Sequence, residues 1–506
     1  MPAHRRLRPT GGRGRLTSSG VSAQTIRARR VGAVVGLLAL VIIVVALTGR
    51  GGGPRRLVAG GGGAGGTFDP LAYDPAHESA FEAAAASGLS NVIYTKSPGG
   101  AAASAARTLA FAGLAAKAAS AGALSGSTLE AIVMLESAGR PQVIAGSDPS
   151  AAAGLTQIVA GTATQLLGMR VDLAASRRLG AEIATARARG QVATAARLEA
   201  DRARIDQRFD PAQALAATER YLKLAKGVFG RDDLAIESYH MGIGNLETAI
   251  RRYVGSSGAG DPIATVVARN GLSYAKLYFD STPIDHASTY SWLAGLGDDS
   301  STYLWRIEAA GRVLGLYRSD PGRLAAISRL ENAAPSAELV LRGPGTPEFA
   351  TKAALAVGRS SRAVLALPSG SQGAAVGLRP DGPLHLRPEA LATALYMAGA
   401  VRAIAGKGTE LEVSAATTDS ADLQRAALAS HGLAEADPLD ASGYAFDVAR
   451  AYATPAEAQA FQFVLDRLQT LNLIAWNREG RIIHIVVGPA ASMLDGLLKT
   501  LLPSSG

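Results

Sequence analysis

An uncharged apolar segment near the N-terminus constrains this 506-residue chain more than any other feature. Residues 31–48 (VGAVVGLLALVIIVVALT) carry no charged side chain and approach the ~20 residues that a helix needs to cross a hydrocarbon core. A cleaved signal peptide is the alternative, but its apolar core usually spans ~7 to 15 residues before a small-residue cleavage site. We therefore expect one transmembrane helix over residues 31–49.

The charges beside this segment predict its orientation. Eight arginines precede it and three follow closely, so the positive-inside rule makes residues 1–30 a basic cytoplasmic tail. Residues 50–69 are glycine-rich and are expected to form a flexible linker. The rest of the chain is then expected outside the cell membrane, held there by a single-pass anchor.

Positive charge is concentrated at this end, which argues against a nucleic-acid partner. The net charge is +9, but residues 1–66 alone hold 11 arginines and no acid, so the remainder carries −2. Cysteine is absent, which excludes disulfide scaffolds, thiolate nucleophiles and cysteine-ligated zinc. The length allows two or three domains, and long alanine runs favour helix.

A short apolar helix is predicted to end on a glutamate. Ser127 and Glu130 have the spacing of a capping box, and Gly139 and Pro141 signal the end of the helix. Glu136 lies in the last turn beside the apolar face, where desolvation and the helix dipole both raise a carboxyl pKa. A carboxylic acid protonated near neutral pH can protonate a glycosidic oxygen. A solvated glutamate at a frayed helix end is the alternative.

Three motifs occur in order along the chain: LESAGRP at 135–141, GLTQI at 154–158 and ESYHMGIGN at 237–245. This set resembles the soluble lytic transglycosylase family, whose domain has a goose-lysozyme-like fold. The resemblance implies a peptidoglycan lytic transglycosylase, which cleaves the MurNAc-GlcNAc bond of glycan strands without water. The products would be 1,6-anhydromuramyl sugars, and no cofactor would be required.

The resemblance also implies roles for individual residues. Glu136 would be the general acid and base, Gln157 would line the sugar cleft, and Tyr239 would pack over the catalytic carboxylate. The other residues expected to bind substrate are Ser137, Gly154, Leu155, His240, Gly242 and Asn245. This chain departs from the family at Thr156, where methionine is common, and at His240, where asparagine is common.

These motifs define a predicted domain over residues 70–335, with a mainly α, lysozyme-like (α+β) fold. An arginine- and alanine-rich insert at 174–207 has helical periodicity with a break at Gly190, so it is expected to form a helical hairpin. Asp298 and Asp299 are expected to cap a helix over residues 307–318 rather than to bind a cation.

A second, α+β domain is predicted over residues 336–506, with strand-like runs at 363–367 and 482–487. Segments 411–419, 443–447 and 483–485 resemble a degenerate D-alanyl-D-alanine carboxypeptidase-type zinc peptidase domain. The resemblance aligns three positions with its zinc ligands, which here are Asp440, Asp447 and His484.

Three substitutions argue against peptidase activity in this second domain. Asp440 stands in place of a histidine ligand, Thr418 in place of a peptide-binding arginine, and Arg481 in place of the acid before the last histidine. Zinc accepts carboxylates, so a site is not forbidden, but the loss of three functional types together favours a non-catalytic fold. We expect this domain to be inert or to bind peptidoglycan or another wall protein.

Two alternatives stay open for the whole chain. A hydrolytic muramidase of the same fold would need a second carboxylate flanking the bond, but Asp148 lies in a GSDPS segment typical of a capped turn. A non-enzymatic cell-wall-binding scaffold would have both domains diverged from catalysis. Cell-wall or division proteins are further expected partners.

Overall fold

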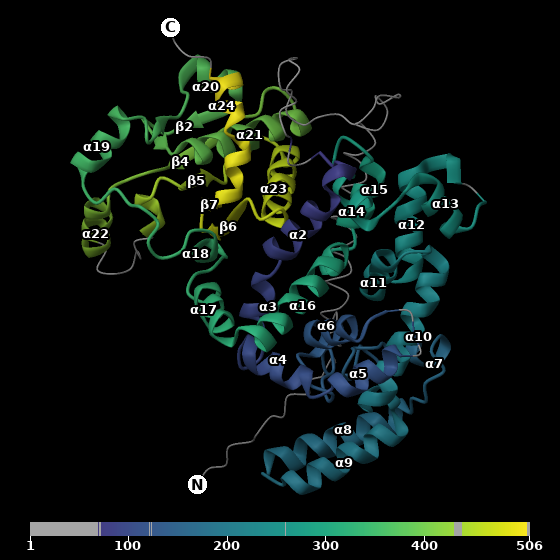
Figure 1. The fold of residues 1–506 in the computed structure, drawn as a ribbon. Coiled ribbons are helices and arrows are strands. Elements are labelled where there is room, and N and C mark those ends of the chain that lie inside the picture. The colour runs from purple at the N-terminus through teal and green to yellow at the C-terminus, as the bar shows by residue number, and fades with distance from the viewer. Residues whose placement is uncertain are drawn as a thin grey trace, which may run out of the picture. The chain divides into compact units, whose positions relative to one another are not determined.

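The computed structural model describes residue 69 and residues 72–502, apart from 121, 123, 259 and 430–437. These residues belong to one compact unit, Gly52–Gly506. The fold is mainly helical with a small β-sheet, as the sequence predicted (Figure 1). The basic tail, the predicted transmembrane segment and all but residue 69 of the linker lie outside the described residues. Within the part that is described, no helix is both long and apolar enough to cross a membrane.

The first predicted domain is built from helices joined by short loops. Its α-helices are α2 (Glu78–Gly88), α3 (Asn91–Thr95), α4 (Ala101–Leu109), α5 (Ala112–Ala119), α6 (Gly126–Ser137), α7 (Ala160–Gln165), α8 (Leu173–Ala188), α9 (Val192–Ile205), α10 (Pro211–Phe229), α11 (Asp232–Met241), α12 (Ile243–Val254), α13 (Ile263–Asn270), α14 (Tyr274–Phe279), α15 (Ala287–Ala294), α16 (Tyr303–Ser319) and α17 (Pro321–Glu331). The 3-10 helices are η1 (Pro75–His77), η2 (Gln207–Phe209), η3 (Gly255–Gly258) and η4 (Asp299–Thr302).

Helix α6 forms where expected, but the predicted capping box is wrong. The N-cap is Ser125, whose hydroxyl accepts a hydrogen bond from the Thr128 backbone N–H at 3.2 Å. Because the helix begins at Gly126, Glu130 lies beyond the first turn, where its carboxylate pairs with Arg318 at 2.7 Å. The helix ends at Ser137 because the next residue takes a left-handed conformation.

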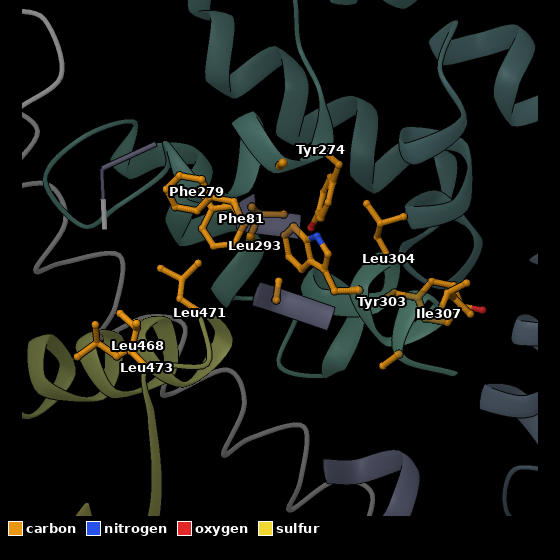
Figure 2. Packing of buried hydrophobic residues seen from close by; sticks show 14 of the residues in the cluster. Phe81, Tyr274, Phe279, Leu293, Tyr303, Leu304, Ile307, Leu468, Leu471 and Leu473 are labelled. Atoms are coloured by element: carbon orange, nitrogen blue, oxygen red, sulfur yellow. The ribbon is translucent and has the colours of Figure 1, made fainter. Parts of the chain in front are cut away.

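Helix α16 packs against α6 and carries an aromatic cluster into the core. It starts at Tyr303, four residues before the predicted start, because Asp298 caps the preceding η4 turn and the chain continues directly into the helix. Trp305 is fully buried, with ring contacts to Tyr274, Tyr278 and Phe279. Figure 2 shows Tyr274, Phe279 and Leu304 of this core from close by.

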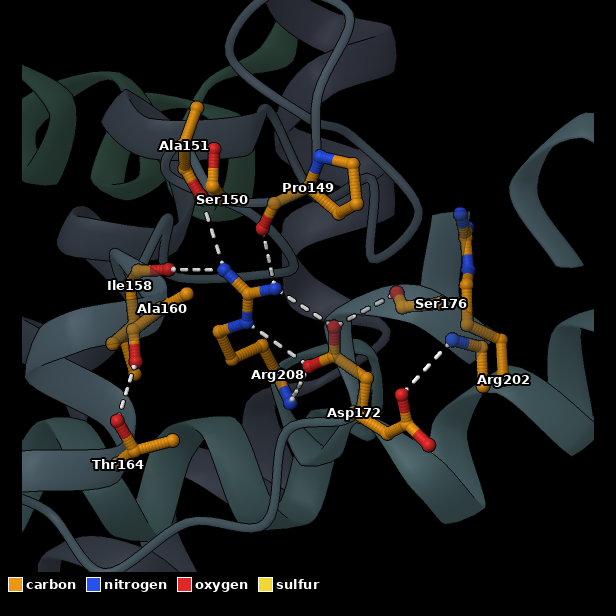
Figure 3. A network of polar contacts seen from close by, with 12 residues as sticks. Pro149, Ser150, Ala151, Ile158, Ala160, Thr164, Asp172, Ser176, Arg202 and Arg208 are labelled. Atoms are coloured by element: carbon orange, nitrogen blue, oxygen red, sulfur yellow. Dashed lines mark hydrogen bonds and ion pairs between the residues drawn. The ribbon is translucent and has the colours of Figure 1, made fainter. Parts of the chain in front are cut away.

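The insert forms a helical hairpin of α8 and α9, which turns at Gly190 with φ of +70°. At its end, the buried Arg208 guanidinium pairs with Asp206 at 2.7 Å and donates to the Pro149 and Ala151 carbonyls at 2.6 and 3.0 Å. Figure 3 shows Arg208 reaching these carbonyls and that of Ile158. The base of the hairpin therefore holds the loop that contains the GLTQI motif.

The second predicted domain surrounds a five-stranded sheet of order β2-β4-β5-β7-β6. Strand β2 pairs with β4 in parallel, and the other neighbours pair antiparallel. The strands are β2 (Leu378–Pro380), β4 (Leu411–Ala415), β5 (Ala445–Ala449), β6 (Ile474–Glu479) and β7 (Ile482–Val487), with a separate pair of β1 (Leu365–Ala366) and β3 (His385–Leu386). The run at 482–487 is a strand as predicted, whereas only two residues of 363–367 are.

Helices flank this sheet and connect its strands. They are α18 (Glu338–Leu341), α19 (Lys352–Ser360), α20 (Gly370–Val376), α21 (Pro388–Ala405), α22 (Ser420–Ala429), α23 (Pro455–Thr470) and α24 (Gly496–Leu501), with the 3-10 helices η5 (Pro438–Ala441) and η6 (Pro489–Leu494). Thr454 caps α23 through its hydroxyl, and proline at the first position fits the helix start.

One buried cation joins α23 to the helical part. Arg467 is 4% exposed and donates to the carbonyls of Tyr278 and Ser281 at 2.9 and 3.0 Å. Its guanidinium also lies 4.1 Å from the centre of the Tyr278 ring. Buried apolar residues of both predicted domains belong to a single core cluster. The division at residue 335 stays a prediction.

Candidate active site

Glu136 occupies the wall of a cavity of about 280 Å³. Apolar neighbours Ile132 and Val133 bury the face of α6 below it, and the chain then turns through Ala138 and Gly139. Gly139 has φ of +72°, and a Cβ there would lie 2.5 Å from Arg107 backbone carbon, so the turn requires glycine. These residues thus place the Glu136 carboxyl in the last turn of α6, at the wall of the cavity.

The environment of Glu136 favours its neutral form. Burial raises the pKa of this carboxyl to about 7, while a hydrogen bond from Tyr303 partly opposes the rise. The Tyr303 hydroxyl donates to Glu136 Oε1 at 2.7 Å. A carboxyl with this pKa is protonated in a large fraction of molecules near neutral pH, and it can also accept the proton back.

Tyr303 was not identified from the sequence, although it is the described side chain that donates to Glu136. It is 2% exposed and lies at the first position of α16, immediately after the η4 turn. Its ring stacks on those of Tyr239 and His240, with centroid distances of 6.2 and 5.3 Å. A tyrosine at a helix start has no distinctive sequence signal, since it is equally typical of core packing.

Tyr239, which was expected over the carboxylate, lies against Tyr303. Its hydroxyl donates to the Thr156 carbonyl at 2.8 Å and shares a 3.1 Å hydrogen bond with Thr218. These contacts connect α11 to the GLTQI loop. Tyr239 therefore supports the ring that contacts Glu136 and also helps to place the loop.

His240 lines the cavity of Glu136 and also a second cavity of about 300 Å³. A 2.8 Å hydrogen bond links His240 Nδ1 to the Ser300 hydroxyl. The second cavity is bounded by Gln157, Tyr239, Gly242 and apolar side chains, among them Ile158 and Leu167. His240 is the lining residue that the two cavities share, and we refer to the two cavities together as the cleft.

Gln157 lies in this second cavity with an unusual backbone. Its φ is +53°, a left-handed conformation that is uncommon outside glycine. Its amide nitrogen donates to the Gly154 and Val143 carbonyls at 2.7 and 3.2 Å, which holds the side chain in place. Gly154 itself must be glycine, because a Cβ would lie 1.8 Å from the Arg208 carbonyl oxygen.

The other residues expected to bind substrate have different positions. The Ser137 hydroxyl donates to the Leu155 carbonyl at 2.7 Å and so links α6 to the GLTQI loop. The Leu155 side chain is fully buried and does not line the cleft. Asn245 lines neither cavity, and its amide donates to the Met241 carbonyl at 2.9 Å. The three motifs thus lie close together, but several of their residues hold the surrounding segments in place and do not line the cleft.

Among the described residues that line the cleft, Asp299 is the one acid besides Glu136. Its carboxylate forms an ion pair with Arg306, and its side chain is 63% exposed. Asp148 accepts hydrogen bonds from the Ser150 N–H and from Arg177, which lower its pKa to about 2. The turn role predicted for Asp148 is therefore confirmed.

Another buried acid lies behind the cleft. Glu237 is fully buried, and its Oε2 accepts the Leu304 N–H at 2.8 Å. Burial raises its pKa to about 8. This residue begins the third motif, but no feature of that motif distinguished it from its neighbours.

Two of the three positions aligned with zinc ligands meet on the sheet, whereas Asp440 lies in η5. Asp447 on β5 and His484 on β7 are directly paired, and His484 Nδ1 lies 2.8 Å from Asp447 Oδ1. The Asp440 carbonyl accepts the Thr418 N–H at 3.1 Å. Asp447 and His484 thus contact each other directly, which fits a paired strand histidine better than a ligand set. Across the described part of the chain, no three His, Asp or Glu side chains are grouped to hold a metal ion.

The chain was also compared with known proteins. No protein-family model matches it, and a search of curated proteins finds no match.

Proposed function

We propose that this chain is a peptidoglycan lytic transglycosylase with Glu136 as its general acid and base. The observation that carries the proposal is a carboxyl on a cleft wall whose pKa burial raises to about 7. The three motifs, in their order along the chain, resemble those of the soluble lytic transglycosylase family. On that basis we infer a lysozyme-like fold for residues 70–335.

The proposed reaction uses one carboxyl twice. Glu136 gives its proton to the glycosidic oxygen as the bond to the muramyl anomeric carbon breaks, assisted by the substrate's own N-acetyl group. The resulting carboxylate then takes the proton of the muramyl 6-hydroxyl, whose oxygen bonds to the anomeric carbon and closes the 1,6-anhydro ring. Glu136 is protonated again at the end, and no water is consumed.

The acidic residues of the cleft support this mechanism over hydrolysis. Inverting and retaining hydrolases need a second carboxylate as base or nucleophile, and Asp299, the other described acid of the cleft, is paired with Arg306. A hydrolytic muramidase that uses Asp299 is the second candidate. A wall-binding scaffold without activity is the third, favoured only if no glycan is cleaved.

The remaining parts of the proposal concern placement. We infer that residues 31–49 anchor the chain in the cell membrane, with the catalytic part outside, where its glycan substrate lies. For residues 336–506 we infer a binding or supporting role, with peptidoglycan or cell-wall and division proteins as partners, rather than zinc peptidase activity.

Mass spectrometry of the muropeptides released from purified peptidoglycan tests the proposal. The wild-type full-length chain should release anhydromuramyl products, and Glu136→Gln should not. Glu182→Gln is the matched control, because Glu182 is an exposed glutamate on the α8–α9 hairpin. Reducing-end products lost in Glu136→Gln would favour the muramidase, and no release by the wild type would favour the scaffold.

A further inference from the structure

The two parts of the cleft differ in charge. The cavity beyond His240 contains no Lys, Arg, Asp or Glu among its described lining residues, and its walls are apolar or aromatic with Gln157. The cavity at Glu136 is lined by three cations, Lys96, Arg140 and Arg306, and by one further acid, Asp299. A neutral sugar chain would fit the first part, whereas the second favours a ligand with negative charge.

Two of these three cations are available to a ligand. Arg306 is paired with Asp299, so those two charges offset each other. Among the described residues, no acidic side chain lies within ion-pair distance of Lys96 or Arg140. Both residues are exposed. The local excess of positive charge on this part of the cleft therefore comes from Lys96 and Arg140.

The two cations come from different segments that border the same cavity. Lys96 follows the last residue of α3, and Arg140 follows the turn after α6, four residues beyond Glu136. The Arg140 Nε–H donates to the Ser137 carbonyl at 3.0 Å, which fixes the side chain near the acid and leaves its terminal nitrogens for another acceptor. Exposed lysines and arginines are common, but two unpaired ones on one catalytic cavity are a specific arrangement.

We propose that Lys96 and Arg140 form a subsite for carboxylates of the peptide carried by the muramyl sugar. This proposal rests on the proposed function and defines its substrate as glycan that still bears an acidic peptide. Arginine can bind a carboxylate through two hydrogen bonds, while lysine supplies a point charge. The neutral part of the cleft holds the sugars, and the subsite selects peptide-bearing strands.

The test compares two glycan substrates prepared from the same peptidoglycan. One keeps its peptides unchanged, and in the other the peptide carboxylates have been converted to neutral amides. The wild-type full-length chain should cleave the strands with free carboxylates with a kcat/KM about tenfold higher, as expected for two partly exposed charge contacts. The preference should shrink as the salt concentration rises, because salt screens exposed charges.

The double variant Lys96→Gln/Arg140→Gln should lose this preference, so that its kcat/KM is about the same for the two substrates. A matched control, Arg178→Gln/Lys223→Gln, removes the same charge from exposed positions that line neither cavity and should keep the preference. Equal cleavage of both substrates by the wild type, or a preference that survives in the double variant, overturns the subsite.

A binding measurement separates this subsite from the proposed function. Soluble disaccharide-peptide should bind the wild-type chain about tenfold tighter than the same molecule with its peptide carboxylates amidated, and the double variant should abolish the difference. If neither strand is cleaved, the proposed function fails, and the binding measurement alone then decides whether the subsite exists. No difference between the two ligands then rejects the subsite.

Discussion

The cleft wall and the core behind it each hold a glutamate whose pKa is raised by burial, to about 7 for Glu136 and about 8 for Glu237. Both contact the start of α16, Glu136 through the Tyr303 hydroxyl and Glu237 through the Leu304 N–H. Only Glu136 borders a cavity, whereas Glu237 is fully buried. The raised pKa therefore reports burial in both places, and access to the cleft distinguishes the acid that we propose as catalytic from the fully buried one.

Replacing each glutamate by glutamine is the sharpest test of this comparison. Glu136→Gln should lower glycan cleavage by about a thousandfold, because it removes the proton that the leaving oxygen needs. Glu237→Gln should stay within about threefold of the wild type, since it keeps an acceptor for the Leu304 N–H. Initial rates of glycan cleavage on one peptidoglycan preparation measure both effects. Similar losses of rate in the two variants would contradict the distinction between the two glutamates.

Stability should respond to Glu237 more than to any other single residue of the site. Glu237→Ala should cost about 2 kcal/mol of unfolding free energy, because it leaves the Leu304 N–H without its acceptor and opens a cavity. Denaturant unfolding measures this cost. Glu237→Gln serves as the control because it keeps both the volume and an acceptor.

The same carboxyl makes stability depend on pH. Its folded pKa, about 8, lies above the ordinary 4.5, so its protonated form stabilises the fold fully below pH 4.5 and this contribution is lost as the pH rises toward 8. For this group alone, the free energy of unfolding should fall by up to about 1.4 kcal/mol per pH unit over that range. Glu237→Gln should show a shallower decline, and identical slopes would contradict the assignment.

Tyr303→Phe should have a smaller effect on rate and a distinctive one on pH dependence. The hydroxyl stabilises the ionised form of Glu136, so its loss should raise the pKa of that carboxyl further above 7. The pH above which activity falls should therefore move upward, while kcat drops about tenfold. A pH profile of kcat checks both effects, and an unchanged or lowered falling limb would contradict this role.

The smallest effect is expected on the sheet. Asp447→Asn should leave glycan cleavage unchanged and cost less than about 1 kcal/mol of stability, because asparagine keeps an acceptor for His484. Thermal unfolding and cleavage rates measure the two quantities. A loss of cleavage above tenfold would show that the sheet contributes to the reaction, against the role inferred for it.

Much of the helical part and of the cleft could be predicted from local patterns in the sequence. The apolar spacing before Glu136 and the end of the helix after it could be predicted, as could the hairpin break at Gly190 and the turn around Asp148. Tyr303 could not be found, because its importance arises from a contact with Glu136, 167 residues away in the chain. The capping box failed because a capping hydroxyl at Ser125 competes with Ser127, and spacing alone does not choose between them.

The contact of Arg467 with α14 has a consequence for the order in which the chain folds. The guanidinium reaches the Tyr278 carbonyl across 189 residues of sequence, so this hydrogen bond forms only after nearly the whole chain has been synthesised. All three motifs emerge earlier, while the core beside Trp305 still lacks the Arg467 guanidinium. Completion of that core is thus coupled to the arrival of the C-terminal residues, and a chain truncated before α23 should fold slowly and expose apolar surface.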